Sequence, residues 1–232
     1  MEINIKRENT TQSFNIERAS TLLEALYSIK TKQDSTLTFD SGCKSGICGC
    51  CSVLVNGKEK LACTHKLEDN DTIEPLRHYK VKKDLLVDKS AQLSLIKQTN
   101  AALANYKQEL LTTKDENLTK IQTDCILCSS CYSACPVIDV NSNFLGPFAL
   151  TRAYRYTADK REENPKDIID SIQTNGVWDC TLCGECTLAC PMGIDPKGDI
   201  VQLRNQSAKF GYMDPNFSNI GFGDGFGFNG GF

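Results

Sequence analysis

The first eighty or so residues alternate between apolar and polar positions in the way that β-strands do. Ile3 and Ile5 alternate with polar neighbours. Phe14 and Ile16 do the same after the polar stretch Asn9–Gln12. Two alternating runs separated by a short polar segment predict a β-hairpin at the start of the chain.

A second hairpin is predicted further along. The alternating residues 53–55 lead directly into Asn56-Gly57, the strongest short turn signal, and Leu61 begins the return strand. Alternation at Leu37–Phe39 predicts a further short strand just before the first cysteines.

One amphipathic helix is predicted between the strands. Thr21 is placed to cap its beginning, and Glu24 is placed to complete a capping box. Its apolar positions follow helical spacing: Leu22, Leu23, Leu26 and Ile29. A hairpin, a crossover helix and more strands around a cysteine loop predict a β-grasp ferredoxin fold for this part.

From about Val87 the pattern becomes helical. A helix is predicted before the second cysteine group by Leu93, Ile96, Leu103, Tyr106 and Leu110. Phe148–Tyr156 and Ile168–Ile172 predict two more helices, and Ile200–Phe210 predicts a closing one. The fold class is therefore α+β, with a β-grasp domain at 1–84 and an all-α helical ferredoxin domain at 85–212.

The last segment, 213–232, alternates glycine with phenylalanine and lacks the aliphatic residues that a core needs. We interpret it as a disordered tail or as a tail that docks on a partner. The composition excludes two other classes. The sequence contains no run of 18 apolar residues, so no membrane span is predicted. A net charge of −3 with a pI near 5.5 gives no basis for nucleic-acid binding.

Twelve of the thirteen cysteines fall into three groups with the spacing of iron–sulfur ligands. The first group reads C-x4-C-x2-C with a more distant fourth cysteine, the plant-type spacing for a 2Fe–2S centre. Its members are Cys43, Cys48, Cys51 and Cys63. Gly42, Gly46 and Gly49 within the loop would let the backbone wrap closely around a cluster and direct N–H groups at sulfur.

The other two groups each read C-x2-C-x2-C-x3-C-P and lie about 55 residues apart. In the two-cluster bacterial pattern, the fourth cysteine of each run binds the other cluster. This predicts two 4Fe–4S centres with crossed ligands. One set is Cys125, Cys128, Cys131 and Cys190, and the other is Cys135, Cys180, Cys183 and Cys186.

Structural zinc and disulfides are the alternatives. Zinc does not account for the third cysteine of each run or for the proline after the fourth. Disulfides need an oxidising compartment, and no signal peptide is expected because Met1–Arg7 is polar and alternating. Cys50 lies between two predicted ligands as a spare thiol, a rescue ligand or a small loop residue.

The whole plan resembles the iron–sulfur subunit of succinate dehydrogenase and fumarate reductase, from the first strand to about Tyr212. The segment 41–49, Ser-Gly-Cys-Lys-Ser-Gly-Ile-Cys-Gly, resembles the family's first cluster loop. Gly146-Pro with Ala153-Tyr-Arg-Tyr, and the segment 191–196, Pro-Met-Gly-Ile-Asp-Pro, resemble its helical domain. The resemblance implies a chain that relays single electrons and needs other subunits for any substrate chemistry.

Two departures from the family's pattern concern the distal cluster. Most members lack the second cysteine of the last run and hold a 3Fe–4S cluster there, whereas Cys183 predicts 4Fe–4S. The usual quinone-pocket residues are replaced by Val137-Ile-Asp-Val and by Thr181. These changes resemble the variant group with a cysteine-rich membrane partner of the heterodisulfide-reductase type.

The resemblance implies an FAD-bearing flavoprotein subunit on one side and a membrane-anchor or heterodisulfide-reductase-like subunit on the other. It implies a peripheral membrane complex, expected on the cytoplasmic face of a prokaryotic inner membrane, or exported with a signal-bearing partner. Two alternatives stay open: a subunit of another flavoprotein complex that oxidises a hydroxy acid or reduces a disulfide, and a free multi-cluster ferredoxin. Apolar neighbours of the cysteines, expected to exclude solvent or simply to form core, are Ile126, Leu127, Val137 and Leu182.

Overall fold

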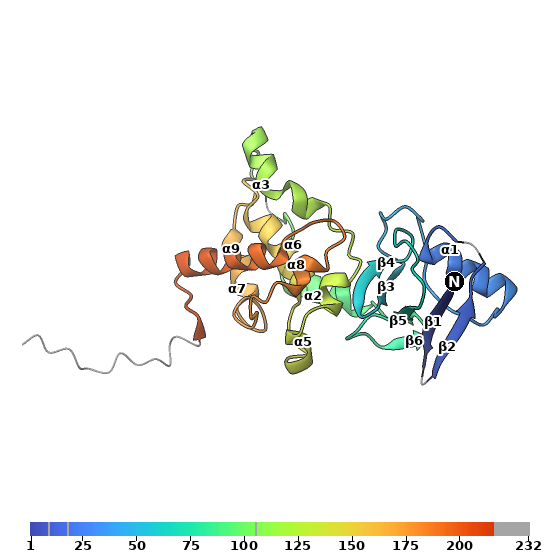
Figure 1. Cartoon of the computed structure of the whole chain (residues 1–232). Helices are drawn as coiled ribbons and strands as arrows, with labels where there is room; N and C mark the ends of the chain where they lie inside the picture. Colours follow the sequence, from blue (N-terminus) through green and yellow to red (C-terminus); the bar gives the residue numbers. More distant parts are fainter. Residues whose placement is uncertain (9, 18, 105, 216–232) are drawn as a thin grey trace, which may run out of the picture.

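The computed structural model describes residues 1–8, 10–17, 19–104 and 106–215. Most of the predicted Gly/Phe-rich tail therefore lies outside the described residues. A strand-rich N-terminal half and a helical C-terminal half lie side by side (Figure 1), which gives the predicted α+β class. None of the described helices is long and apolar enough to span a membrane.

The N-terminal half is built on a five-stranded mixed sheet with strand order β2-β1-β5-β3-β4. Its strands are β1 (Glu2–Arg7), β2 (Thr10–Asn15), β3 (Ser52–Val55), β4 (Lys58–Leu61) and β5 (Asp71–Glu74). The β1–β5 pair is parallel, and the other pairs are antiparallel. A separate two-stranded ribbon, β6 (Val81–Lys83) and β7 (Leu86–Val87), follows.

Both predicted hairpins are present. In the second, Asn56 and Gly57 have φ values of 52° and 76°, the left-handed pair that a two-residue hairpin turn requires. In the first, the predicted turn at Asn9–Gln12 was placed too late, because Thr10, Thr11 and Gln12 already pair with β1. Exposed polar residues on an edge strand resemble a turn in sequence, which explains the error.

The predicted helix is α1 (Leu22–Lys32), which buries Leu22, Leu23, Ala25, Leu26 and Ile29 in the N-terminal core. The Thr21 side chain accepts the Glu24 N–H as expected, but the Glu24 carboxylate accepts the N–H of Ser20 at 2.7 Å instead of that of Thr21. The two side chains still satisfy two backbone donors at the beginning of the helix.

The predicted strand at Leu37–Phe39 is absent. Leu37 is fully buried, so its side chain contributes to the core although residues 37–39 form no strand. The backbone here is held by the Asp84 carboxylate, which accepts the Thr38 N–H at 2.8 Å, and by the Thr38 carbonyl, which accepts the Leu85 N–H. Side-chain acceptors can replace a neighbouring strand in this way.

The C-terminal half packs its helices around a second core. The helices are α2 (Ala91–Gln98), α3 (Thr113–Thr123), α4 (Ser130–Ser133), α5 (Val137–Val140), α6 (Pro147–Thr157), α7 (Pro165–Ser171), α8 (Glu185–Leu188) and α9 (Pro196–Lys209). Helix α9 packs along α6, and both supply the fully buried centre with Leu150, Ile200 and Leu203. The helices predicted from 148, 168 and 200 onward are confirmed as α6, α7 and α9.

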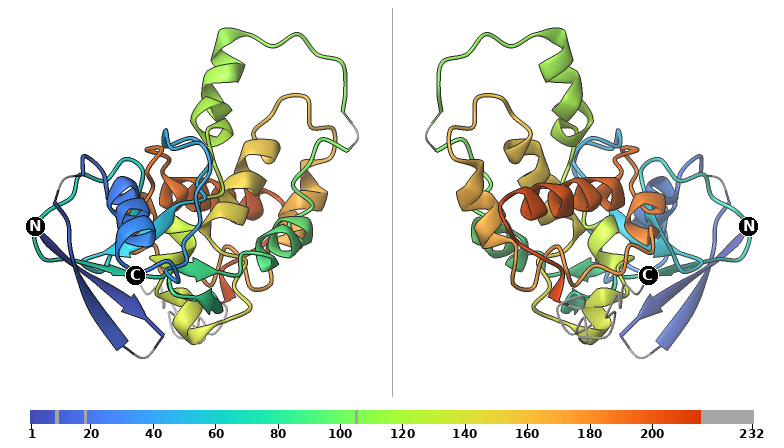
Figure 2. Two further views of the ribbon diagram at one scale, coloured as in Figure 1. Left: turned by 90° about the vertical axis from the view of Figure 1, so that its right-hand side faces the viewer. Right: turned by 90° about the vertical axis from the view of Figure 1, so that its left-hand side faces the viewer.

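The predicted helix through Leu93–Leu110 is wrong beyond residue 98. Thr99 turns its hydroxyl onto the Ile96 carbonyl, and Asn100 adopts a left-handed φ of 49°, which ends α2. Leu110 is 91% exposed. The helix before the cysteines is instead α3, which extends away from the body of the molecule (Figure 2).

Candidate metal centres

The first cysteine loop surrounds its sulfurs with backbone donors. The Cys43 Sγ accepts N–H groups from Ser45 at 3.4 Å, Ile47 at 3.3 Å and Cys48 at 3.3 Å. The Gly46 N–H donates to the Cys63 Sγ at 3.2 Å. The hydrogen bond from Ser45, followed by those from Ile47 and Cys48, lowers the pKa of Cys43 to about 7. Such donors stabilise a thiolate, which is the form that binds metal.

Two glycines of this loop are needed for its shape. A Cβ on Gly42 would lie 2.8 Å from the Cys48 Sγ, and Gly46 has a left-handed φ of 73°. The four predicted ligands of this loop are brought together, with Cys51 and Cys63 buried and Cys43 exposed. Burial raises the pKa of Cys51 to about 12.

Cys50 lies beside these thiols without backbone N–H donors to its sulfur among the described contacts. Its Sγ lies 3.8 Å from the Cys48 carbonyl oxygen. The Cys48 thiol, followed by burial, raises the pKa of Cys50. The loop thus favours thiolate at Cys43 and disfavours it at Cys50, which fits the interpretation of Cys50 as a small loop residue.

The two CP-terminated runs fold in the same way. Leu127 and Leu182 have φ values of 50° and 57°, and Ser129 and Gly184 have φ values of 76° and 90°. Each run then forms one short helix, α4 or α8, and ends at its fourth cysteine and proline. At Gly184, where φ is 90°, a Cβ would meet only the Lys197 side chain at 3.6 Å, so among the protein contacts this glycine serves the left-handed backbone.

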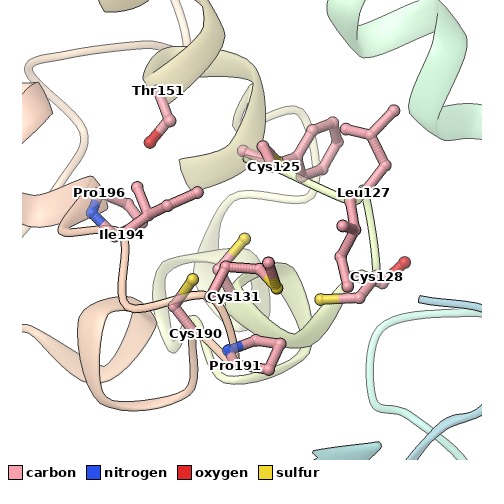
Figure 3. A pocket seen from close by; sticks show the side chains of 13 residues that line it. Cys125, Leu127, Cys128, Cys131, Thr151, Cys190, Pro191, Ile194 and Pro196 are labelled. Carbon is pink, nitrogen blue, oxygen red and sulfur yellow. The ribbon is translucent and has the colours of Figure 1, made fainter. Parts of the chain in front are cut away.

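The crossed arrangement brings Cys190 to the first run. Cys190 lines a cavity together with Cys125, Cys128 and Cys131. Figure 3 shows the sulfurs of Cys128 and Cys190 directed into the shared space from opposite sides. Burial raises the pKa of Cys125, and the thiols of Cys128 and Cys190 raise it further, as expected for neighbouring thiols.

The remaining four predicted ligands form the second group. Burial, followed by the thiols of Cys180, Cys135 and Cys183, raises the pKa of Cys186 to about 12. Burial, together with the thiols of Cys180 and Cys183, raises the pKa of Cys135 to about 11. Cys135 and Cys186 are buried, whereas Cys183 is exposed. All four side chains are therefore mutual neighbours, although Cys135 belongs to the other run.

Apolar side chains enclose these thiols only in part. Val137 is buried, whereas Ile126, Leu127 and Leu182 are half-buried. Ile126 and Leu127, with Phe148 and Ile194, line the cavity of the first group. They restrict water on that side and so affect the potential of any bound centre.

Arg204 of α9 supports the second group and was missed by the sequence reasoning. It donates to the Cys180 carbonyl at 2.6 Å and to the Val177 carbonyl at 2.8 Å, while its guanidinium lies over the Trp178 ring. No spacing rule indicates this role, because the contact depends on how α9 packs against the cysteine loop.

The N-terminal loop touches the first helical-domain run directly, which sequence also did not reveal. A Cβ built on Gly49 would lie 2.8 Å from both Cα and Cβ of Cys128 and 2.9 Å from the Ile126 carbonyl oxygen. The buried Cys128 belongs to the N-terminal core cluster, and Ile126 packs against it. The loops of the first and second cysteine groups are thus in van der Waals contact.

The donor sets suit clusters better than single ions. Within the described residues, no three His, Cys, Asp or Glu side chains close around a point that could hold one metal ion. A zinc ion needs all its sulfurs about 2.3 Å from one point. In a 4Fe–4S cluster each of the four thiolates binds a different iron, so the sulfurs stand around a larger space, as the four cysteines of the cavity do.

Comparisons with known proteins agree with the interpretation of these cysteine groups as iron–sulfur sites. Residues 2–94 match the family described as a 2Fe-2S iron-sulfur cluster binding domain, and residues 121–194 match a 4Fe-4S dicluster domain. The chain is 34% identical to the fumarate reductase iron-sulfur subunit of Mycobacterium tuberculosis, covering 88% of each chain. It is 36% identical to the 8-methylmenaquinol:fumarate reductase iron-sulfur subunit of Wolinella succinogenes, covering 83% of this chain and 66% of that one.

A solved structure shares the fold. A chain of the Mycobacterium smegmatis Sdh1 complex in the apo form superposes with a TM-score of 0.77 at 20% identity, covering 91% of this chain and 97% of that one. The likeness confirms the predicted combination of a strand-rich first half and a helical second half.

Proposed function

The chain belongs to the family of iron–sulfur subunits of succinate dehydrogenase and fumarate reductase, and on that premise we propose that it relays single electrons between an FAD-bearing flavoprotein subunit and a membrane-associated subunit or the quinone pool. The family's role is electron transfer within an oxidoreductase complex. Iron–sulfur centres pass electrons singly, whereas a flavin can accept the pair that succinate gives up. The chain alone is proposed to be inert toward succinate and fumarate.

We propose that three clusters form the relay. The 2Fe–2S centre would be held by Cys43, Cys48, Cys51 and Cys63. The first 4Fe–4S centre would be held by Cys125, Cys128, Cys131 and Cys190, and the distal one by Cys135, Cys180, Cys183 and Cys186. The observation that carries this proposal is the cavity at which Cys190 meets the three cysteines of the other run.

We divide the chain into 1–84, 85–212 and 213–232 for these roles. The first part would hold the 2Fe–2S centre and the second both 4Fe–4S centres. The contact between Gly49 and Cys128 supports electron passage between the two parts, because it leaves no solvent layer between the loops.

Iron content and paramagnetic resonance test the distal centre. The reconstituted full chain should bind about ten iron atoms, and its reduced form should show two 4Fe–4S signals. Cys183→Ser should lose one iron, and the oxidised protein should then show a 3Fe–4S signal. Cys50→Ser is the matched control and should keep all three centres. A full-yield three-iron signal in the oxidised wild type would refute the assignment of Cys183.

We further propose that the distal centre hands electrons to a cysteine-rich subunit of the heterodisulfide-reductase type, on the cytoplasmic face of the membrane. The support is local: Thr181 is exposed beside the second group, and α5, the segment that replaces the family's usual quinone-pocket residues, presents Val140 at 86% exposure. Copurification from the native membrane tests this. Recovery of a haem-bearing anchor without a cysteine-rich subunit would contradict it.

A further inference from the structure

One lysine lies at the contact between the first two cysteine loops. Lys89, in the connection between β7 and α2, belongs to neither loop. Its Nζ donates to the Gly49 carbonyl at 3.4 Å and to the Cys128 carbonyl at 3.3 Å. It therefore binds one backbone oxygen on each side of the point where Gly49 touches Cys128.

The charge of Lys89 is not consumed by an ion pair. Among the described residues, no salt bridge to its Nζ is formed, and Asp40 is an acidic side chain whose charge acts on it. Burial lowers the pKa of Lys89, whereas the thiol of Cys128, followed by Asp40, Cys50 and Cys51, opposes that effect. Lys89 also lines a small cleft with Cys50 and Cys51.

This placement brings one positive charge close to thiols of two different proposed centres. Cys51 is a proposed ligand of the 2Fe–2S centre, and Cys128 is a proposed ligand of the first 4Fe–4S centre. Each electron that enters a centre adds one negative charge, and a nearby ammonium favours that reduced state. Because the side chain is half-buried, solvent screens the interaction only partly.

We propose that Lys89 is a positioning residue for electron transfer between the 2Fe–2S centre and the first 4Fe–4S centre: it holds the two loops together, and its charge raises the reduction potentials of both. The inference rests on the proposed function. One electron passes from the reduced 2Fe–2S centre to the oxidised 4Fe–4S centre, with no bond formed or broken and no proton transferred.

The test is a redox titration of the reconstituted full chain, followed by electron paramagnetic resonance, in the wild type and three variants. Lys89→Met removes both charge and hydrogen bonds, Lys89→Gln removes the charge but keeps a donor, and Lys89→Arg keeps both. In the Met and Gln variants, the equilibrium constant for reducing the first 4Fe–4S centre should fall about tenfold, equivalent to about 59 mV for one electron. The 2Fe–2S centre should shift in the same direction.

The distal centre serves as an internal control, because Lys89 touches none of its proposed ligands. Its potential should stay unchanged in every variant, and Lys89→Arg should match the wild type at all three centres. Unchanged potentials in Lys89→Gln, or an equal shift at all three centres, would overturn the proposal. If Lys89→Met does not assemble its clusters, the reduction potentials of Lys89→Gln provide the test. Loss of both nearby clusters in Lys89→Gln would show that Lys89 has a purely structural role and would overturn the proposal.

Failure of this inference differs from failure of the proposed function. If the relay itself is misassigned, the wild type will not show three centres in the ratio of one 2Fe–2S to two 4Fe–4S. If only the role of Lys89 is wrong, the wild type will show these three centres, and the variants will have the same reduction potentials as the wild type.

Discussion

Replacing Gly49 with alanine should separate the two cysteine loops that meet at Cys128. The left-handed backbone at Gly49, with φ of 69°, costs an alanine about 1–2 kcal/mol. Its Cβ would also lie 2.8 Å from the Cys128 Cα and 2.9 Å from the Ile126 carbonyl oxygen, both backbone atoms that cannot turn aside. Such overpacking costs about 1–3 kcal/mol, so the total loss of stability should be about 2–5 kcal/mol.

Gly57→Ala is the matched control for this change. Gly57 has a similar φ of 76°, but a Cβ there would meet only the end of the Arg77 side chain, at an ordinary contact distance of 3.6 Å. The control should lose only the backbone contribution of about 1–2 kcal/mol. For a chain of this length, each kcal/mol lowers the melting temperature by about 2–4 °C.

Circular dichroism melts of the reconstituted proteins at one scan rate measure the difference. Gly49→Ala should melt roughly 4–20 °C below the wild type, and below Gly57→Ala measured under the same conditions. The spin–spin interaction between the 2Fe–2S and first 4Fe–4S centres should also weaken in Gly49→Ala alone. If both variants lose the same amount and the interaction is intact, the Gly49–Cys128 contact does not determine loop spacing.

Two further predictions concern α9. Burial raises the pKa of Asp199 from 3.8 to about 6. The protonated carboxyl therefore stabilises the folded chain at acid pH, and this stabilisation is lost as the pH rises through about 6. Asp199→Asn should therefore become more stable than the wild type between pH 5 and pH 8, by up to about 3 kcal/mol, and a melting-temperature difference independent of pH would contradict this. Arg204→Gln, which loses hydrogen bonds to Val177 and Cys180, should cost about 2–4 kcal/mol and lower the potential of the distal centre only. Arg204→Lys should keep that potential, and equal potentials in all three proteins would refute a role for the charge.

Local signals were sufficient for much of the fold. The hairpin at Asn56-Gly57 follows from the turn geometry that those two residues favour, and α1 follows from its apolar stripe and the cap at Thr21. Helix α3 has no such stripe, since none of its residues is buried. Its one signal was the capping box of Thr112 and Asp115, which is present in the structure.

Contacts that depend on docking could not be predicted. Cysteine spacing predicted that Cys190 would join the first run, because that spacing repeats a known ligand pattern. The positions of Lys89 and Arg204 depend on how separate elements pack around the cysteine loops, and neither residue belongs to a motif. The residues that position the sites were therefore missed even where the proposed ligands were named.

The meeting of Cys190 with Cys125, Cys128 and Cys131 also has a consequence for how the chain is made. A cluster across these residues closes a loop of about 60 residues, which in the chain-entropy description of cross-links stabilises the folded chain by about 4 kcal/mol. Neither group of four thiols is complete until the second run has left the ribosome. Insertion of the two proposed 4Fe–4S clusters must therefore wait until the second run has been synthesised, and a translation product truncated before Cys180 can complete neither proposed site.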